Sequence, residues 1–240
     1  MTTQRTKEEK EANVEKIKAE TEKAQAEARK VKAEALSAEF KAQKEELELQ
    51  KLIDAENKIK ASDAENNVYR FNGAVDKASV IKCRAKLTQW ARLNPNCDME
   101  IVFASPGGSI TAGFELFDYI QQLRSYGHKI TTGSLGMAAS MAGILLQAGE
   151  NRWIGHQSWI LIHRASFGAI GKSFEIEDEV AWIKRIEERI INIFASRSTL
   201  TSLKIKRNWD RKDWWINADE ALEMGLVDEI RGALLEHNDG

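Results

Sequence analysis

Three short segments of this 240-residue chain carry residue types that together could perform acyl transfer. Ser140 lies in the small-residue segment Gly136–Gly143, the glycine turn Ser105–Ser109 precedes it, and His163 follows it. A serine hydroxyl is a weak nucleophile at neutral pH, so it needs a nearby base and hydrogen-bond donors for the oxyanion that forms on attack. Because the three segments offer a candidate for each part, they indicate the chemistry of a serine peptidase.

Backbone amides are the candidate oxyanion donors. The paired glycines of the Ser105–Ser109 turn join a predicted strand to a predicted helix, where they allow a sharp turn and leave N–H groups uncovered beside the positive helix end. The N–H of Met141, directly after Ser140, is a second candidate. Taken alone, the turn is more often a plain connection, and small residues such as those around Ser140 more often serve helix packing.

His163 is the candidate base among the four histidines of the chain. It ends the apolar run Trp159–His163, where a rigid strand can orient an imidazole for proton transfer. His128 and His156 each lie beside a glycine, in a predicted turn and a predicted hairpin, and His237 lies in a polar tail. We expect these three to be exposed.

A carboxylate must also hold the imidazole in the correct tautomer. The local sequence does not single one out. Four downstream aspartates are open to this role, and each could equally be a surface charge or a helix cap: Asp178, Asp210, Asp213 and Asp228.

The composition narrows the class of protein. A net charge of -2 provides no basic excess for a nucleic-acid partner. No run approaches the ~18 to 20 apolar residues that span a bilayer, and the first residues lack the apolar stretch of a signal peptide, so we expect a cytoplasmic protein without a membrane partner. Cys83 and Cys97 are too few for a disulfide framework, and no cluster has zinc-ligand spacing. We therefore expect two reduced, inert thiols, no metal and no cofactor.

Residues 1–66 predict a long, charged helical arm. From Thr6 to Asn66 the chain is almost wholly Ala, Glu, Lys, Gln and Leu, without glycine or proline, and opposite charges recur three and four residues apart. The arm is either a solvated, partly disordered helix, or a weak coiled coil or partner-bound segment.

The coiled-coil seam of this arm is poor in large residues. With Val14 at position a, the a row continues with Thr21, Ala28 and Ala35. The matching d row is Ile17, Ala24, Val31 and Ala38. We assign a second apolar patch to a different phase; its members are Leu36, Phe40, Leu47, Leu49, Leu52, Ile53 and Ile59.

Residues 67–232 predict a globular α/β domain, followed by a polar tail at 233–240. Apolar runs of strand length alternate with segments of helical periodicity, which implies a largely parallel sheet with crossover helices. The predicted strands are Val68–Phe71, Met99–Ala104, Lys129–Thr132 and Ser158–His163. The predicted helices are Val75–Leu93, Ile110–Tyr126, a helix that contains Ser140 and runs through Leu146, and Phe174–Ser196.

These residues resemble the ClpP family of serine peptidases over about Val68 to Ile230. The family's Ser-Pro-Gly-Gly-Ser turn, Gly-x-Ala-Ala-Ser-Met segment and Ile-His strand read here as Ser105–Ser109, Gly136–Met141 and Leu161–His163. Asn217–Ala221 and Gly225–Asp228 are similar to its closing motifs. Together, and in family order, these motifs are specific, although each alone is weak.

The resemblance implies a crotonase-like β/α spiral with Ser140 as nucleophile, His163 as general base and Asp213 as the acidic member of the triad. It implies the backbone N–H groups of Gly108 and Met141 as oxyanion donors. It also implies a polypeptide substrate and a homo-oligomeric ring, heptameric or doubled, with the helix at Phe174–Ser196 mediating ring stacking.

Departures from the family pattern leave the partner open. The segment after His163 has fewer glycines than in the family, and the long arm would crowd the pore where an ATP-dependent unfoldase docks. A phage capsid maturation protease of the same fold, acting on capsid or scaffold proteins, is the alternative. Two minor alternatives are an acyl-CoA enzyme of crotonase type and an inactive assembly protein.

Overall fold

The chain folds into two compact units, which comprise residues 1–61 and residues 62 onward. The computed structural model describes residues 2–210 and 212–232, with side chains described from Ala12 onward. The predicted tail at 233–240, with His237, lies outside the described residues.

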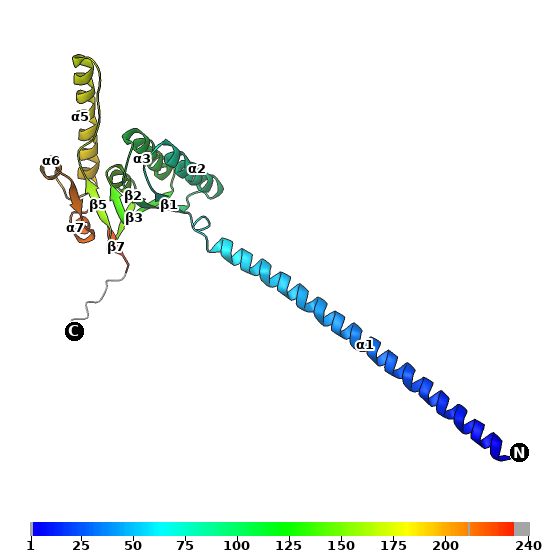
Figure 1. Cartoon of the computed structure of the whole chain (residues 1–240). Coiled ribbons are helices and arrows are strands. Elements are labelled where there is room, and N and C mark those ends of the chain that lie inside the picture. The colour runs from blue at the N-terminus through cyan, green and yellow to red at the C-terminus, as the bar shows by residue number, and fades with distance from the viewer. Residues whose placement is uncertain (1, 211, 233–240) are drawn as a thin grey trace, which may run out of the picture. The chain divides into compact units, whose positions relative to one another are not determined.

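The first unit is a single helix. Figure 1 shows that helix α1 runs from Thr2 to Lys60 without interruption. At the usual rise per residue, its 59 residues extend over roughly 90 Å. Every side chain from 12 to 60 is exposed. Ion pairs between residues three or four apart, such as Lys30 with Glu34 and Lys51 with Glu48, support the helix locally. The predicted long N-terminal helix is confirmed.

The second unit is a mixed α/β domain, as predicted. Its described strands are β1 (Val68–Asn72), β2 (Asp98–Ser105), β3 (Lys129–Ala139), β4 (Asn151–Gly155), β5 (Trp159–Ile162), β6 (Trp214–Ile216) and β7 (Glu229–Arg231). Its described helices are α2 (Lys77–Leu93), α3 (Ile110–Ser125), α4 (Met141–Leu146), α5 (Ser173–Ser196), α6 (Ser202–Trp209) and α7 (Ala218–Glu223).

Strand β3 organises the sheet because its two halves have different neighbours. The sheet order is β1-β2-β3-β4-β7, with all of these pairs parallel. The first half of β3, at Thr131–Ser134, pairs with β4, whereas its last three residues, Met137–Ala139, pair with β5. Strand β6 then adds to β5 in the antiparallel direction. The sheet therefore divides along β3.

Helices α2 and α3 pack side by side (Figure 1). The buried residues of α2 recur every three or four positions, at Val80, Cys83, Leu87 and Trp90, so one face of the helix enters the core. Asp76 caps this helix: its carboxylate accepts a hydrogen bond from the backbone N–H of Ser79 at 2.8 Å.

Among the described helices, none combines the length and the apolar character that crossing a membrane requires.

The structure corrects three local predictions. Strand β3 continues to Ala139 instead of ending at Thr132, so Ser140 precedes a short helix and does not lie inside one. Gly155–Gln157 is not a hairpin, because β4 and β5 pair with opposite halves of β3. His128 is buried, with its Nδ1 3.5 Å from the sulfur of Cys97, and is not exposed as expected. Sequence alternation reports periodicity within a strand and says nothing about which strand lies beside it.

A buried arginine ties β4 to the C-terminal part of the domain. The guanidinium of Arg152 donates to both carboxylate oxygens of Asp228, at 3.0 and 2.6 Å, and to the side-chain oxygen of Gln147 at 2.8 Å. It also donates to the backbone carbonyl of Arg197. Burial acts to raise the pKa of Asp228, but the hydrogen bonds and charge of Arg152 outweigh it, so this pKa lies below its ordinary value.

Replacing Asp228 by asparagine is expected to destabilise the domain by about 2 kcal/mol at neutral pH, because the buried Arg152 loses its counter-charge. The folded-state pKa of Asp228 is depressed, so its contribution is present above the unfolded pKa of about 4 and is lost as the pH falls through the folded value. Urea unfolding of both proteins at pH 7 and pH 3 measures this. A gap between them that fails to narrow at pH 3 would contradict the assignment.

Candidate active site

Ser140 occupies a strained turn between strand β3 and helix α4. Its backbone has φ 54° and ψ -122°, a conformation that costs a non-glycine residue on the order of 1–3 kcal/mol. The Ser140 N–H donates to the carbonyl of Leu161 at 2.9 Å, and the Ser140 carbonyl accepts from Gly143 at 3.0 Å. A serine held on such a strand-to-helix turn presents its hydroxyl outward, as nucleophilic serines do in other hydrolases.

The glycine turn after β2 lies directly against Ser140. A Cβ added to Gly107 would lie 2.6 Å from the Cβ of Ser140 and 2.5 Å from the carbonyl oxygen of Ala139. Gly107 also has φ +89°, and Gly108 has φ +149°. Only glycine allows this approach, which explains why the turn carries two glycines in succession.

Gly108 is held in place by its neighbours while its own amide stays uncommitted. The N–H of Val75 donates to the carbonyl of Gly107 at 2.8 Å, and the N–H of Ser109 donates to the carbonyl of Val75 at 2.7 Å. Within residues 2–210 and 212–232, neither the N–H of Gly108 nor that of Met141 donates a backbone hydrogen bond. Two free N–H groups beside a serine are what an oxyanion requires.

Ser140, Met141, Gly108 and His163 line one cavity of about 240 Å³. They come from segments far apart in sequence. Strand pairing brings Ser140 and His163 together. Ala139 lies beside Leu161 in the parallel register of β3 and β5, so both residues follow the carboxyl ends of adjacent strands. The structure thus brings together four of the five predicted site residues.

Asp213, the fifth predicted residue, is exposed and does not line the cavity. It directly precedes β6, as His163 directly follows β5. In this antiparallel pair Ile162 lies opposite Trp214 and Leu161 opposite Trp215, and the pairing ends there. One further step of the same register would set His163 opposite Asp213. Directly opposed residues share one face of a sheet. Among the described residues, no hydrogen bond joins the His163 ring to Asp213.

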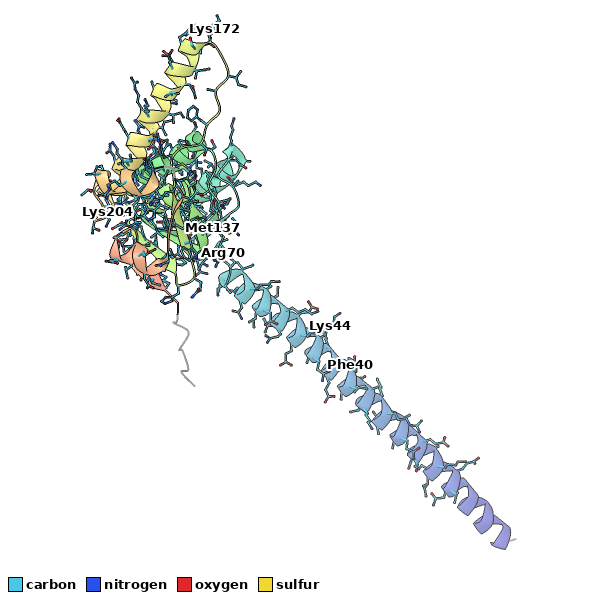
Figure 2. The ribbon with its side chains drawn as sticks, turned by 60° about the vertical axis from the view of Figure 1, so that its left-hand side comes forward. Phe40, Lys44, Arg70, Met137, Lys172 and Lys204 are labelled. Atoms are coloured by element: carbon cyan, nitrogen blue, oxygen red, sulfur yellow. The ribbon has the colours of Figure 1, made fainter. Side chains whose placement is uncertain are left out.

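The other three candidate aspartates have different surroundings. Asp228 is the partner of Arg152, and Asp210 lies 3.6 Å from a guanidinium nitrogen of Arg164. Asp178 is an exposed residue of α5, which Figure 2 shows projecting from the sheet toward Lys172. Of the four, only Asp213 lies next to the register pair of Ile162 with Trp214, one position before β6.

Sequence reasoning missed the apolar wall of the cavity. It is formed by Ile110, Ile144, Ile162, Ile190 and Phe194. Ile190 and Phe194 belong to the buried face of α5. Their four-residue spacing predicts that the two side chains share one face of the helix, but it does not predict that this face lines the cavity. Arg164, which follows His163, also lines the cavity and donates two hydrogen bonds of 3.0 Å to Glu187 of α5.

Neither cysteine belongs to this cavity. Both thiols are free, and burial raises the pKa of Cys83 and of Cys97 above the ordinary value. Among the described residues, no group of three or more His, Cys, Asp or Glu side chains is arranged to hold a metal ion.

Comparison with known proteins places the second unit within a family. Residues 55–233 match the Clp protease family. The chain is 36% identical over 169 residues to the ATP-dependent Clp protease proteolytic subunit 2 of Tropheryma whipplei (strain Twist), covering 70% of this chain and 92% of the relative. It is 33% identical over 158 residues to the ATP-dependent Clp protease proteolytic subunit of Porphyromonas gingivalis (strain ATCC BAA-308 / W83), covering 65% and 69%.

Replacing Gly107 by alanine is expected to lower the reactivity of Ser140 at least about tenfold, because the new methyl group would displace the turn from the serine. Gly168→Ala is the matched control, since nothing lies within 4 Å of a Cβ there and φ is not positive. The rate of covalent labelling by a fluorophosphonate measures the effect, with circular dichroism to check folding. Equal rates in the two folded variants would show that the turn does not position Ser140.

Proposed function

The chain belongs to the Clp protease family, and from that premise we propose that it is a serine endopeptidase in which Ser140 is the nucleophile, His163 the general base and Asp213 the group that orients His163. The observation that carries this proposal is the single cavity lined by Ser140, His163 and the two backbone amides.

The proposed reaction follows from this arrangement. A ring nitrogen of His163 takes the proton of the Ser140 hydroxyl as the oxygen attacks the peptide carbonyl carbon. The carbonyl oxygen becomes an oxyanion and accepts hydrogen bonds from the N–H groups of Gly108 and Met141. His163 returns the proton to the leaving amine as the C–N bond breaks, and water then hydrolyses the acyl-enzyme by the same steps.

Asp213 has the role of fixing the tautomer of His163. Its position in register with His163 across β5 and β6 supports the assignment. In free enzymes catalytic hydrogen bonds are often long and tighten only when substrate is bound. We propose that the carboxylate accepts a hydrogen bond from the imidazole in that state and stabilises the imidazolium that forms.

The apolar wall of the cavity selects the substrate side chain. Isoleucines at 110, 144, 162 and 190, with Phe194, offer no charge to pair with a substrate, and the guanidinium of Arg164, which also lines the cavity, is already paired with Glu187. A peptide with an apolar residue next to the scissile bond fits such a surface, because burial of that side chain is favourable and burial of an unpaired charge is costly.

Assembly and partners extend the proposal. The relatives are named as proteolytic subunits of ATP-dependent proteases, which supports an oligomeric ring supplied with polypeptide by an ATP-dependent unfoldase. One observation favours the alternative of a phage capsid maturation protease: most of α1 precedes the region that matches the family, which begins at residue 55. Both alternatives use the same catalytic chemistry and differ only in the protein that brings the substrate.

The catalytic assignment is tested by labelling with a fluorophosphonate. We expect one label per chain on Ser140, no label in Ser140→Ala, and rates lowered at least about a hundredfold in His163→Ala and less severely in Asp213→Asn. Ser125→Ala, an exposed serine at the end of α3, is the control and should label normally. Label persisting on another serine in Ser140→Ala would refute the nucleophile, and an unlabelled native chain would favour an inactive assembly protein.

Cleavage preference is tested with peptides that differ only in the residue before the scissile bond. Leucine or phenylalanine should give a kcat/KM at least about tenfold above that of aspartate. Ile190→Ala enlarges the cavity and should shift the preference toward phenylalanine. Ile193→Ala, on the same helix but outside the cavity, should lower stability without this shift. A preference that is unchanged in Ile190→Ala would exclude this wall as the selective surface.

A further inference from the structure

Helix α1 carries a heptad pattern that spans most of its length in a single frame. Counting from Val14 as position a, the positions a and d recur without a break up to Ile59 because the helix itself has no interruption. The a positions are Val14, Thr21, Ala28, Ala35, Ala42, Leu49 and Glu56. The d positions are Ile17, Ala24, Val31, Ala38, Glu45, Leu52 and Ile59.

This frame revises the phase expected for the second apolar patch. Leu49, Leu52 and Ile59 fall on the same a and d seam as Val14 and Ile17. The remaining members lie elsewhere: Leu36 is at b, Phe40 and Leu47 are at f, and Ile53 is at e. The seam therefore has large apolar residues near both ends and mostly alanines between them, together with Thr21, Val31 and Glu45.

The seam of α1 is exposed to solvent along the described helix. The side chains of its larger residues are 55–68% exposed, because neighbouring residues of the same helix do not cover them. These residues are Val14, Ile17, Val31, Leu49, Leu52 and Ile59. The alanines between them have side chains small enough for a second helix to approach closely. A continuous stripe of this kind is favourable only when another helix covers it.

The polar residues of the seam have local partners that reduce their cost. The hydroxyl of Thr21 donates to the carbonyl of Ile17 at 2.7 Å, and Glu56 pairs with Lys60 at 2.7 Å. Within the described part of the chain, Glu45, at position d, is the one charged seam residue that forms no ion pair. It is expected to limit stability in the middle of the seam.

Charges beside the seam favour parallel copies in register. In such a pair, position g of one helix faces position e of the next heptad of the other. Glu27 then faces Lys32, and Lys41 faces Glu46, which are both attractive contacts.

One contact of the same kind is unfavourable. Glu34 faces Glu39, but Glu34 already has Lys30 at 3.9 Å on its own helix, which reduces the repulsion. The balance of these flanking contacts is attractive.

We propose that α1 docks against α1 of a second copy of this chain, forming a parallel, in-register two-stranded coiled coil from Val14 to Ile59. In this pairing the seam residues of the two copies cover each other, while Leu36, Phe40 and Leu47 stay on the outer face. Figure 2 labels Phe40, which lies in the C-terminal half of the helix. The inference does not rest on the proposed peptidase activity, because none of its residues lies in the second unit.

Direction and register are tested by cysteine cross-linking of the full chain. Ala24→Cys, at d, and Ala42→Cys, at a, are made separately in a Ser140→Ala background to exclude self-cleavage. A parallel, in-register pair brings each new cysteine opposite its own copy, so both variants should form symmetric disulfides identified by peptide mass spectrometry.

Ala33→Cys, at the outer position f, is the matched control, and the yield of its disulfide should be at least about fivefold lower. The background protein reports any reaction of Cys83 or Cys97. An antiparallel pair cannot place both 24 opposite 24 and 42 opposite 42. Disulfides that join 24 to 42 in a mixture of the variants, or yields no higher than that of Ala33→Cys, would overturn the proposal.

The seam itself is tested by a matched pair of double variants. Leu49→Gln with Leu52→Gln removes two leucines from the seam, and Leu36→Gln with Leu47→Gln removes two leucines of similar exposure from outside it. The first should lower the yield of the Ala24→Cys disulfide at least about tenfold, and the second should leave it within twofold. Equal effects of the two, or a loss only in the second, would exclude this seam as the docking surface.

Discussion

The divided pairing of strand β3 is the constraint on which the rest of the second unit depends. Its first half pairs with β4 and its last three residues pair with β5, so the hydrogen-bonding neighbour of β3 on this side changes before the strand ends at Ala139. The residue that follows is Ser140. Because β5 ends one residue before His163, the same pairing that divides the sheet also carries the serine and the histidine to one edge.

The close approach of the glycine turn is the second constraint, and it depends on the first. Gly107 lies against the Cβ of Ser140, so the turn is set by where β3 ends. The positive φ of Ser140 is maintained by the hydrogen bond from its N–H to Leu161, which belongs to the strand that β3 joins last. At the site, backbone strain therefore falls on Ser140, and the adjacent strands supply the contacts that maintain it.

The two units are stabilised by different physics. In the second, apolar residues recur on helix faces that enter a shared core, as Leu87 of α2 and Leu116 of α3 do. In α1 the stabilisation is local, from residues of high helix propensity and from ion pairs three or four residues apart. A helix of this kind leaves its apolar stripe exposed, and that stripe is the surface that a second copy would cover.

The sequence by itself determined the features that depend on neighbouring residues. It predicted the long helix α1, the approximate bounds of β1, β2, α2, α3 and α5, and the two segments that contain Ser140 and His163. Propensity, periodicity and glycine turns act over a few residues, so they can be read along the chain.

Only the tertiary structure decided what depends on distant pairing. It buried His128, extended β3 to Ala139, and set the apolar face of α5 against the cavity. It also distinguished the aspartates: Asp228 pairs with Arg152, whereas Asp213 directly precedes β6, the strand that pairs with β5. The physical reason is that these outcomes depend on which strands lie side by side and in which register, and residues far apart in sequence leave no local pattern of that choice.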